Sequence, residues 1–223
     1  MSAKAVADFY AQHRGGGLLT EALNQRAGSW LALGADRSGL APSTVTVLGL
    51  LVGVGGSALI VLIGQSAAWL GLVAWHLAYS LDCADGQLAR ATGRTSPAGG
   101  RLDVLCDLAV QIGVVAAVSV IAAQASPGMP AWLPPVFAGA WLINLFTSVL
   151  AAGPGAASLL SSGSLAVRVL KLVRDHSVMI TLCGLVILLR PGWTPWLMAG
   201  LVVVNGGFLA LSIAQALRRS LAA

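Results

Sequence analysis

The chain has 223 residues, of which 57% are hydrophobic and 9% are charged, and its mean hydropathy is +0.84. Soluble domains carry about 25% charged residues, so this composition excludes a soluble globular domain and also an intrinsically disordered chain. Three cysteines are too few for a disulfide scaffold. At roughly 20 apolar residues per membrane span, the length predicts an all-α integral membrane protein with six transmembrane helices.

Residues 1–42 mix charged and apolar side chains, and they lack the continuous apolar core of a signal peptide. Apolar residues such as Phe9, Tyr10 and Trp30 predict an amphipathic juxtamembrane helix that lies along the membrane surface and is interrupted at glycines 15–17. A loosely ordered tail is the alternative. We expect residues 1–42 to form a cytoplasmic or interfacial segment and residues 43–223 to form the six-span membrane domain.

Six apolar stretches predict the spans. The fifth is short for a span, so we expect it to extend back through residues 168–177. The stretches cover residues 44–64, 67–81, 102–123, 131–152, 178–189 and 195–217.

The distribution of Lys and Arg predicts the orientation. If the N-terminus is cytoplasmic, the outer connections hold only Arg190, and the other 12 of the 13 basic residues lie in inner segments. This asymmetry follows the positive-inside rule and predicts a multi-pass protein of the cytoplasmic membrane with both termini in the cytoplasm. The same asymmetry accounts for the net charge of +5, so the charge does not indicate a nucleic-acid partner.

Four of the eight acidic residues, Asp82, Asp85, Asp103 and Asp107, fall where the second and third spans meet the cytoplasm. A carboxylate at mid-bilayer costs about 2.5–3.5 kcal/mol, so such a cluster needs cations nearby. Each pair has the spacing of one helical face, and the Gly- and Pro-containing segment between the pairs predicts a turn. We therefore expect an antiparallel helical hairpin that aims all four carboxylates into one cytoplasmic pocket.

An all-oxygen ligand set favours hard ions such as Mg²⁺ or Mn²⁺ over zinc. Four carboxylates suit two ions, an arrangement that serves phosphoryl transfer. Gly86 and Ala89 share the carboxylate face and leave space for a substrate, and Arg90 can pair with phosphate oxygens.

The segment from Asp82 to Asp107 resembles the signature of the CDP-alcohol phosphatidyltransferase family, D-x-x-D-G-x-x-A-R-x₈-G-x-x-x-D-x-x-x-D. All eight fixed residues are present at the family spacing. The six predicted spans and the surface helix at the N-terminus also look like this family. One departure is Ser43, which follows Pro42 where family members often have Asn, while Thr46 remains a candidate nucleotide contact.

The resemblance implies an enzyme of phospholipid biosynthesis, which transfers a phosphatidyl-type group from a CDP-linked lipid such as CDP-diacylglycerol to a hydroxyl acceptor and releases CMP. It also implies a homodimer. Asp107 would act as general base as well as metal ligand. Asp82, Asp85 and Asp103 would bind the metal ions. Gly86 and Ala89 would leave room for the cytidine and the diphosphate. The phosphates would lie along Arg90, Ser96 and Gly99.

Arg168, Lys171 and Arg174 recur at every third position before the fifth span. They either anchor the helix to lipid headgroups or bind an acceptor that carries its own phosphate, such as inositol phosphate or glycerol phosphate. We expect Asp175 to pair with Arg174 or Lys171. His76 is predicted to face away from the acidic residues and to pack or hydrogen-bond between helices.

Two other classes of protein use intramembrane carboxylates. A divalent-cation transporter places acids along a route across the bilayer, whereas here they gather at one membrane face. An intramembrane prenyltransferase usually has two Asp-rich motifs in separate loops, whereas the other main inner loop here offers Asp175 alone.

Overall fold

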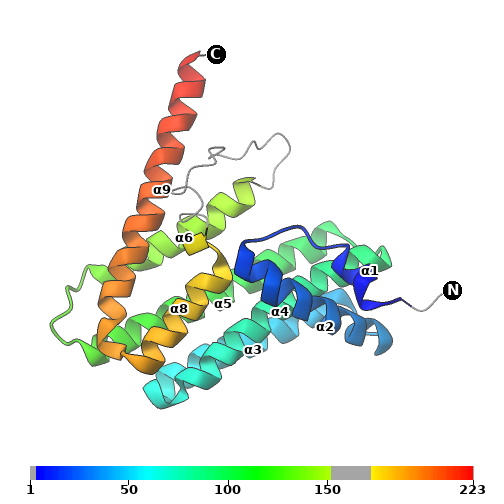
Figure 1. The fold of residues 1–223 in the computed structure, drawn as a ribbon, viewed down its shortest axis with the longest axis horizontal. Coiled ribbons are helices and arrows are strands. Elements are labelled where there is room, and N and C mark those ends of the chain that lie inside the picture. Colours follow the sequence, from blue (N-terminus) through cyan, green and yellow to red (C-terminus); the bar gives the residue numbers. More distant parts are fainter. Residues whose placement is uncertain (1–3, 152–171, 223) are drawn as a thin grey trace.

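The computed structural model describes residues 4–151 and 172–222, and all regular secondary structure in these ranges is helical (Figure 1). The all-α prediction is therefore confirmed for the described residues. The helices are α1 (Val6–Tyr10), η1 (Thr20–Gln25), α2 (Arg26–Arg37), α3 (Pro42–Ile63), η2 (Gln65–Ala67), α4 (Ala68–Thr92), α5 (Pro97–Ala125), α6 (Leu133–Ala151), α8 (His176–Leu189), η3 (Pro191–Trp193) and α9 (Thr194–Ala222).

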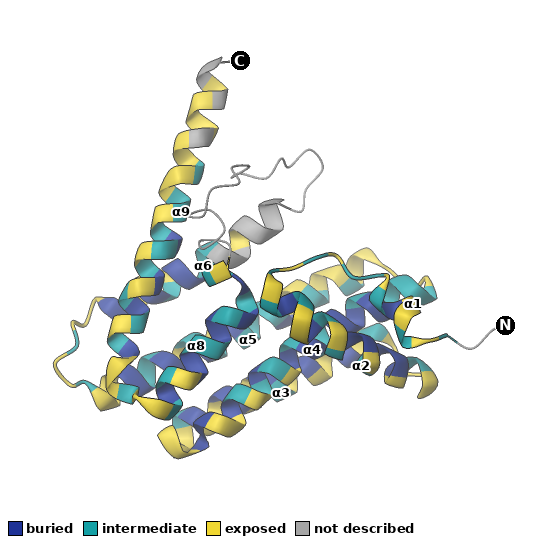
Figure 2. Ribbon diagram, viewed as in Figure 1, coloured by how far each residue is buried: buried dark blue, intermediate teal, exposed yellow. Residues whose placement is uncertain are grey.

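Three helical stretches in the described part of the chain are long and apolar enough to cross a membrane: Pro42–Ile63, Pro97–Ala125 and Pro191–Arg218. Shorter apolar helices cover Leu133–Ile143 and His176–Leu189. Leu51, Leu62 and Val203 are 63%, 82% and 72% exposed on these helices (Figure 2). Large aliphatic side chains are normally buried in a soluble protein, so these faces fit contact with lipid. The count of six spans stays a prediction.

Helix α4 is long but mixed in composition. Its residues are mainly apolar up to Leu81, and the polar remainder carries Asp82, Asp85 and Arg90. Gly93 ends the helix in the left-handed conformation (φ +68°). After this short turn the Ser96 side chain caps α5 by accepting a hydrogen bond from the Gly99 amide at 3.0 Å. This turn folds α4 and α5 into the expected hairpin.

Glycines allow α3 to lie close to its neighbours. A Cβ atom on Gly53 would lie 2.6 Å from the Val110 side chain of α5, and one on Gly56 would lie 2.5 Å from Ala74 of α4. Small residues at such positions let membrane helices approach closely. The largest buried cluster of apolar side chains includes the rings of Trp75 and Trp141.

The N-terminal helices pack on the polar part of α4. Phe9, Ala32 and Leu33 form a buried cluster with Ala84 and Leu88 of α4. The chain between α1 and η1 is not helical over residues 13–17, which matches the expected interruption at the glycines. Whether these helices lie on a membrane surface stays a prediction.

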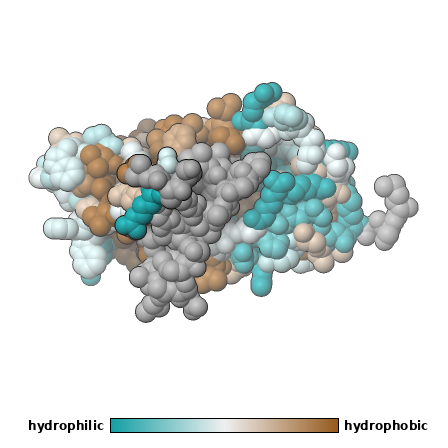
Figure 3. All heavy atoms as spheres, turned by 90° about the horizontal axis from the view of Figure 1, so that it is seen from above, coloured by the Kyte–Doolittle hydropathy of each residue, from teal (hydrophilic) through white to brown (hydrophobic). Residues whose placement is uncertain are grey.

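The connections between helices alternate between two ends of the bundle. The Gln65 side-chain amide donates to the Leu188 carbonyl at 2.9 Å, so the turns after α3 and α8 lie at the same end. The opposite end holds the α4–α5 turn and the N-terminal helices (Figure 1). Figure 3 shows hydrophilic side chains gathered at this second end, and hydrophobic ones along the upper edge of the view and toward the other end. Charge is therefore concentrated beside the acidic motif.

Candidate active site

Two cavities adjoin at the polar end of α4. The larger has a volume of about 480 Å³ and the smaller a volume of about 30 Å³. Thr46 and Asp85 line both of them, so the two cavities meet at this pair. The hairpin that the sequence predicts thus forms one wall of both.

The larger cavity contains most of the residues that the motif assigned to the donor. It also contains Arg14 and Arg94, which sequence reasoning missed, and Ser43, which the sequence singled out at the position where family members often have Asn. The assigned residues that line it are Thr46, Asp85, Gly86, Ala89, Arg90, Ser96, Gly99 and Asp103. Side chains from the N-terminal segment, α3, α4 and α5 therefore surround one space.

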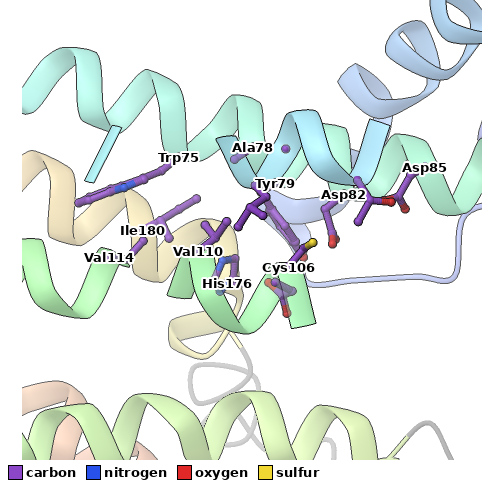
Figure 4. A pocket seen from close by; sticks show the side chains of 14 residues that line it. Trp75, Ala78, Tyr79, Asp82, Asp85, Cys106, Val110, Val114, His176 and Ile180 are labelled. Carbon is purple, nitrogen blue, oxygen red and sulfur yellow. The ribbon is translucent and has the colours of Figure 1, made fainter. Parts of the chain in front are cut away.

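The smaller cavity has a polar and an apolar end. Figure 4 shows Asp82 and Asp85 at one end and the apolar side chains of Trp75 and Ile180 at the other. Asp107 also lines this cavity, as do the aromatic residues Tyr79 and His176, which sequence reasoning did not assign to the site. The Tyr79 and His176 rings contact each other edge to face, with centroids 4.7 Å apart.

The four carboxylates line two cavities that meet at Asp85, and whether all four act as one site stays a prediction. Asp82 and Asp107 line the smaller cavity and Asp103 lines the larger. Within residues 4–151 and 172–222, no three His, Cys, Asp or Glu side chains already surround one metal position. Metal binding at this site would therefore require some carboxylates to turn toward a common point.

Protein groups hold two of these carboxylates. The Thr46 hydroxyl donates to Asp85 from α3. On α5 the Gln111 side-chain amide donates to Asp107 Oδ2 at 2.8 Å, and Gln111 Oε1 in turn accepts from the Trp141 indole at 3.1 Å. Asp103 Oδ1, by contrast, is buried without a hydrogen-bond partner. A buried anionic oxygen without a donor is costly, so this oxygen is suited to a cation.

Gly86 gives the Arg90 side chain its position. A Cβ atom on Gly86 would lie 2.9 Å from Arg90 Nη1, so only glycine lets the guanidinium lie against the helix here. Arg90 Nε donates to the Gln12 carbonyl at 2.8 Å. Burial lowers the pKa of Arg90, as does, to a smaller extent, the positive charge of Arg14. Arg90 thus faces the larger cavity beside a second cation.

The basic triad can be placed only in part, because Arg168 and Lys171 lie outside the described residues. Arg174 lines neither cavity. Its Nε donates to Asn205 Oδ1 at 3.1 Å, and its guanidinium lies 3.4 Å from the centroid of the Phe208 ring of α9.

The expected pairing of Asp175 with Arg174 or Lys171 stays a prediction, because Lys171 lies outside the described residues; the contacts shown for Asp175 include several backbone amides. Asp175 accepts hydrogen bonds from the backbone amides of Leu19 at 2.9 Å, Thr20 at 3.0 Å and Ser177 at 3.0 Å. Helix N-termini carry unpaired amides that attract a carboxylate. One carboxylate therefore caps both α8 and the helical turn that leads into η1.

The interpretation of His76 is confirmed. Its Nε2 is hydrogen-bonded to the Thr181 hydroxyl of α8 at 2.9 Å. His76 lines neither cavity, so it connects two helices and stays apart from the acidic residues.

Comparison of the chain with known protein families agrees with the motif. A family model described as CDP-alcohol phosphatidyltransferase matches residues 39–205, which include all four motif aspartates but not Arg14. No curated protein matches the chain.

Proposed function

The chain belongs to the CDP-alcohol phosphatidyltransferase family, and we propose that it transfers a phosphatidyl-type group from a CDP-linked lipid to a hydroxyl acceptor and releases CMP. Members of this family are transferases of substituted phosphate groups, so the chain is an enzyme. The observation that carries the proposal is the junction at Asp85 between a cavity lined by arginines and one lined by carboxylates. Family membership favours this reaction over cation transport and prenyl transfer.

The larger cavity is proposed as the site of the CDP group. Its volume of about 480 Å³ lies within the range of about 300–1,000 Å³ that is typical of small-molecule sites. Arg90 and Arg94 face it and offer guanidinium donors that suit phosphate oxygens. Ser96 and Gly99 at the start of α5 line the same wall.

The family is generally dependent on divalent metal ions. The residues at the cavity junction fit such ions, because the donor atoms are carboxylate oxygens and Asp103 Oδ1 is buried and unpaired. We propose that Asp82, Asp85, Asp103 and Asp107 hold Mg²⁺ or Mn²⁺, two ions in all. Bound ions would stabilise the negative charge that develops on the phosphoryl oxygens and on the departing CMP.

Asp107 is the proposed general base. Gln111 donates to one of its oxygens and so holds the carboxylate in the smaller cavity. The acceptor hydroxyl gives its proton to Asp107, and its oxygen forms a bond to the lipid-bearing phosphorus. The bond between that phosphorus and the CMP oxygen breaks, so the products are the new phospholipid and CMP.

We place the enzyme in the cytoplasmic membrane, with both termini and both cavities on the cytoplasmic side. The concentration of Lys and Arg at that end supports this orientation. Residues 1–42 would form the interfacial segment and residues 43–223 the six-span domain, and a homodimer is expected. The proposed acceptor is inositol phosphate or glycerol phosphate, recognised by Arg168, Lys171 and Arg174, and the product would enter phospholipid biosynthesis.

The experiment incubates the purified full-length chain with CDP-diacylglycerol, Mg²⁺ or Mn²⁺, and a panel of polar alcohols, and it measures CMP. We expect CMP release to require the lipid nucleotide, the metal and one particular acceptor. Absence of CMP with every alcohol tried, from protein that is folded, would refute the proposal.

A further inference from the structure

The N-terminal segment reaches the donor cavity, although it lies far from the motif in sequence. Arg14 lines the larger cavity together with Arg90 and Arg94. It belongs to residues 12–17, which we call the strap, between α1 and the helical turn before η1. The family match begins at residue 39, so the match assigns no role to the strap.

Hydrogen bonds fix the strap on both sides of Arg14. Before it, the Gln12 carbonyl accepts from Arg90 Nε at 2.8 Å. After it, the Gly15 carbonyl accepts from Gln25 Nε2 at 3.0 Å. Gln25 is itself held by the buried Gln87 of α4, whose side-chain amide donates to Gln25 Oε1 at 2.8 Å. The strap is therefore connected to α4 through Arg90 and Gln87, both within five residues of Asp85.

The backbone of the strap also depends on glycine. Gly15 has φ +78°, a left-handed conformation that other residues rarely adopt. A Cβ atom on Gly17 would lie 2.3 Å from Asp175 Oδ2, so any side chain there would push the strap off the carboxylate that caps the next helical turn. These contacts set the path of the chain around Arg14, and the Arg14 side chain is left exposed at the cavity.

The charges around this space call for an anion. Arg14 and Arg90 are close enough to repel each other, and Arg94 adds a third positive charge to the same lining. Asp85 and Asp103 line the same cavity and call for positive charge, since they are the proposed metal ligands. A diphosphate satisfies both sets at once, because its oxygens can face the guanidinium groups on one side and metal ions on the other.

We propose that Arg14 binds the diphosphate of the CDP-linked donor and that the strap is a built part of the donor site. The inference rests on the proposed function and deepens it. It makes the N-terminal segment a contributor to donor affinity, in addition to any contact that the segment makes with the membrane surface.

The test measures equilibrium binding of CDP, in the presence of Mg²⁺, to the full-length chain in phosphatidylcholine nanodiscs. Arg14→Ala should weaken CDP binding about 10-fold, the loss of one charge-assisted interaction, and leave cytidine binding within about 2-fold. Arg14→Lys should retain part of the affinity, because the charge is kept and the bidentate geometry is lost. Gln25→Ala, which frees the strap, should weaken CDP binding about 3-fold.

Arg26→Ala is the matched control, because Arg26 is also an exposed arginine of the N-terminal region and lines neither cavity. It should leave CDP binding unchanged. Equal losses in the Arg14 and Arg26 variants would overturn the proposal, since they would reflect net charge alone. Unchanged CDP binding in Arg14→Ala would overturn it too. So would a loss of CDP binding that appears only when the measurement is repeated in membranes of anionic lipid.

Two further results separate this inference from the proposed function. If the wild-type chain binds no CDP, the proposed function fails. If the wild-type chain binds CDP and releases CMP, but Arg14 variants match it in donor KM, only the role of Arg14 fails. Arg14→Gln, which keeps a long polar side chain, carries the same expectation as the alanine variant if that variant does not fold.

Discussion

The two cavities that meet at Asp85 and Thr46 differ in volume and lining. The larger, of about 480 Å³, has three arginines in its wall, and the smaller, of about 30 Å³, has mainly aromatic and aliphatic side chains around Asp82 and Asp107. A nucleotide diphosphate suits the first. The second has room for a water molecule or a hydroxyl group and little more. If the donor binds in the larger cavity and Asp107 acts from the smaller one, as proposed, donor binding and proton removal can be disrupted separately.

The largest expected effect falls on the chemical step and much less on donor binding. Asp107→Asn should lower CMP release by at least about 10²–10⁴-fold, because the variant lacks the general base. CDP binding, measured by equilibrium titration, should fall far less than CMP release, since Asp107 lines only the smaller cavity and Asp82, Asp85 and Asp103 remain to hold the metal ions. Release of CMP at a rate near wild type would remove the assignment of the base.

Thr46 lines both cavities, so its variants should affect donor binding and the reaction together. Thr46→Val keeps the shape of the side chain but removes the hydroxyl that donates to Asp85. The loss of a donor to a buried carboxylate costs about 1–3 kcal/mol, so we expect CMP release and CDP affinity each to fall about 10-fold. Thr46→Ser keeps the hydroxyl and should restore most of both. A change in CMP release alone, or in CDP affinity alone, would argue against the assignment of Thr46 to both cavities.

A smaller effect should be confined to donor affinity. In Gly86→Ala the new Cβ would lie 2.9 Å from Arg90 Nη1, so the guanidinium must shift away from the helix. We expect the KM for the CDP-linked lipid to rise about 3-fold to 10-fold, with little change in kcat. Gly55→Ala is the matched control, because nothing lies within 4 Å of the added atom. Equal changes in the two variants would contradict this account of Arg90.

The smallest expected effect concerns stability. Ser96→Ala removes the N-terminal cap of α5, a change that costs about 1 kcal/mol. Thermal unfolding of the detergent-solubilised chain should report this loss, with Ser66→Ala as a control at the other end of the bundle. The donor KM should change by less than about 3-fold. A larger rise in KM would assign Ser96 to phosphate binding and no longer to capping alone.

The sequence predicted the long helices well because a continuous apolar stretch is a local signal. The predicted stretch of residues 102–123 lies within α5 (Pro97–Ala125), and that of residues 44–64 nearly coincides with α3 (Pro42–Ile63). The motif residues also came together as expected, because short spacing along two helices joined by a tight turn fixes their relative positions.

Contacts between distant segments could not be predicted in this way. Asp175 accepts hydrogen bonds from amides more than 150 residues away, and charge alone favoured the neighbouring basic residues. Arg14 reaches the larger cavity because the strap is held to α4 through Arg90 and through Gln25 with Gln87. Arg94, by contrast, lies in the short turn between α4 and α5, inside the motif segment, so its place in the sequence could have identified it.

The most direct test of the account is an experimental structure of the full-length chain with CDP and Mn²⁺. We predict CDP in the larger cavity with its diphosphate between Arg90 and the aspartates, and Mn²⁺ coordinated by oxygens of Asp85 and Asp103. Nucleotide density elsewhere on the molecule, with that cavity left to solvent, would contradict the account.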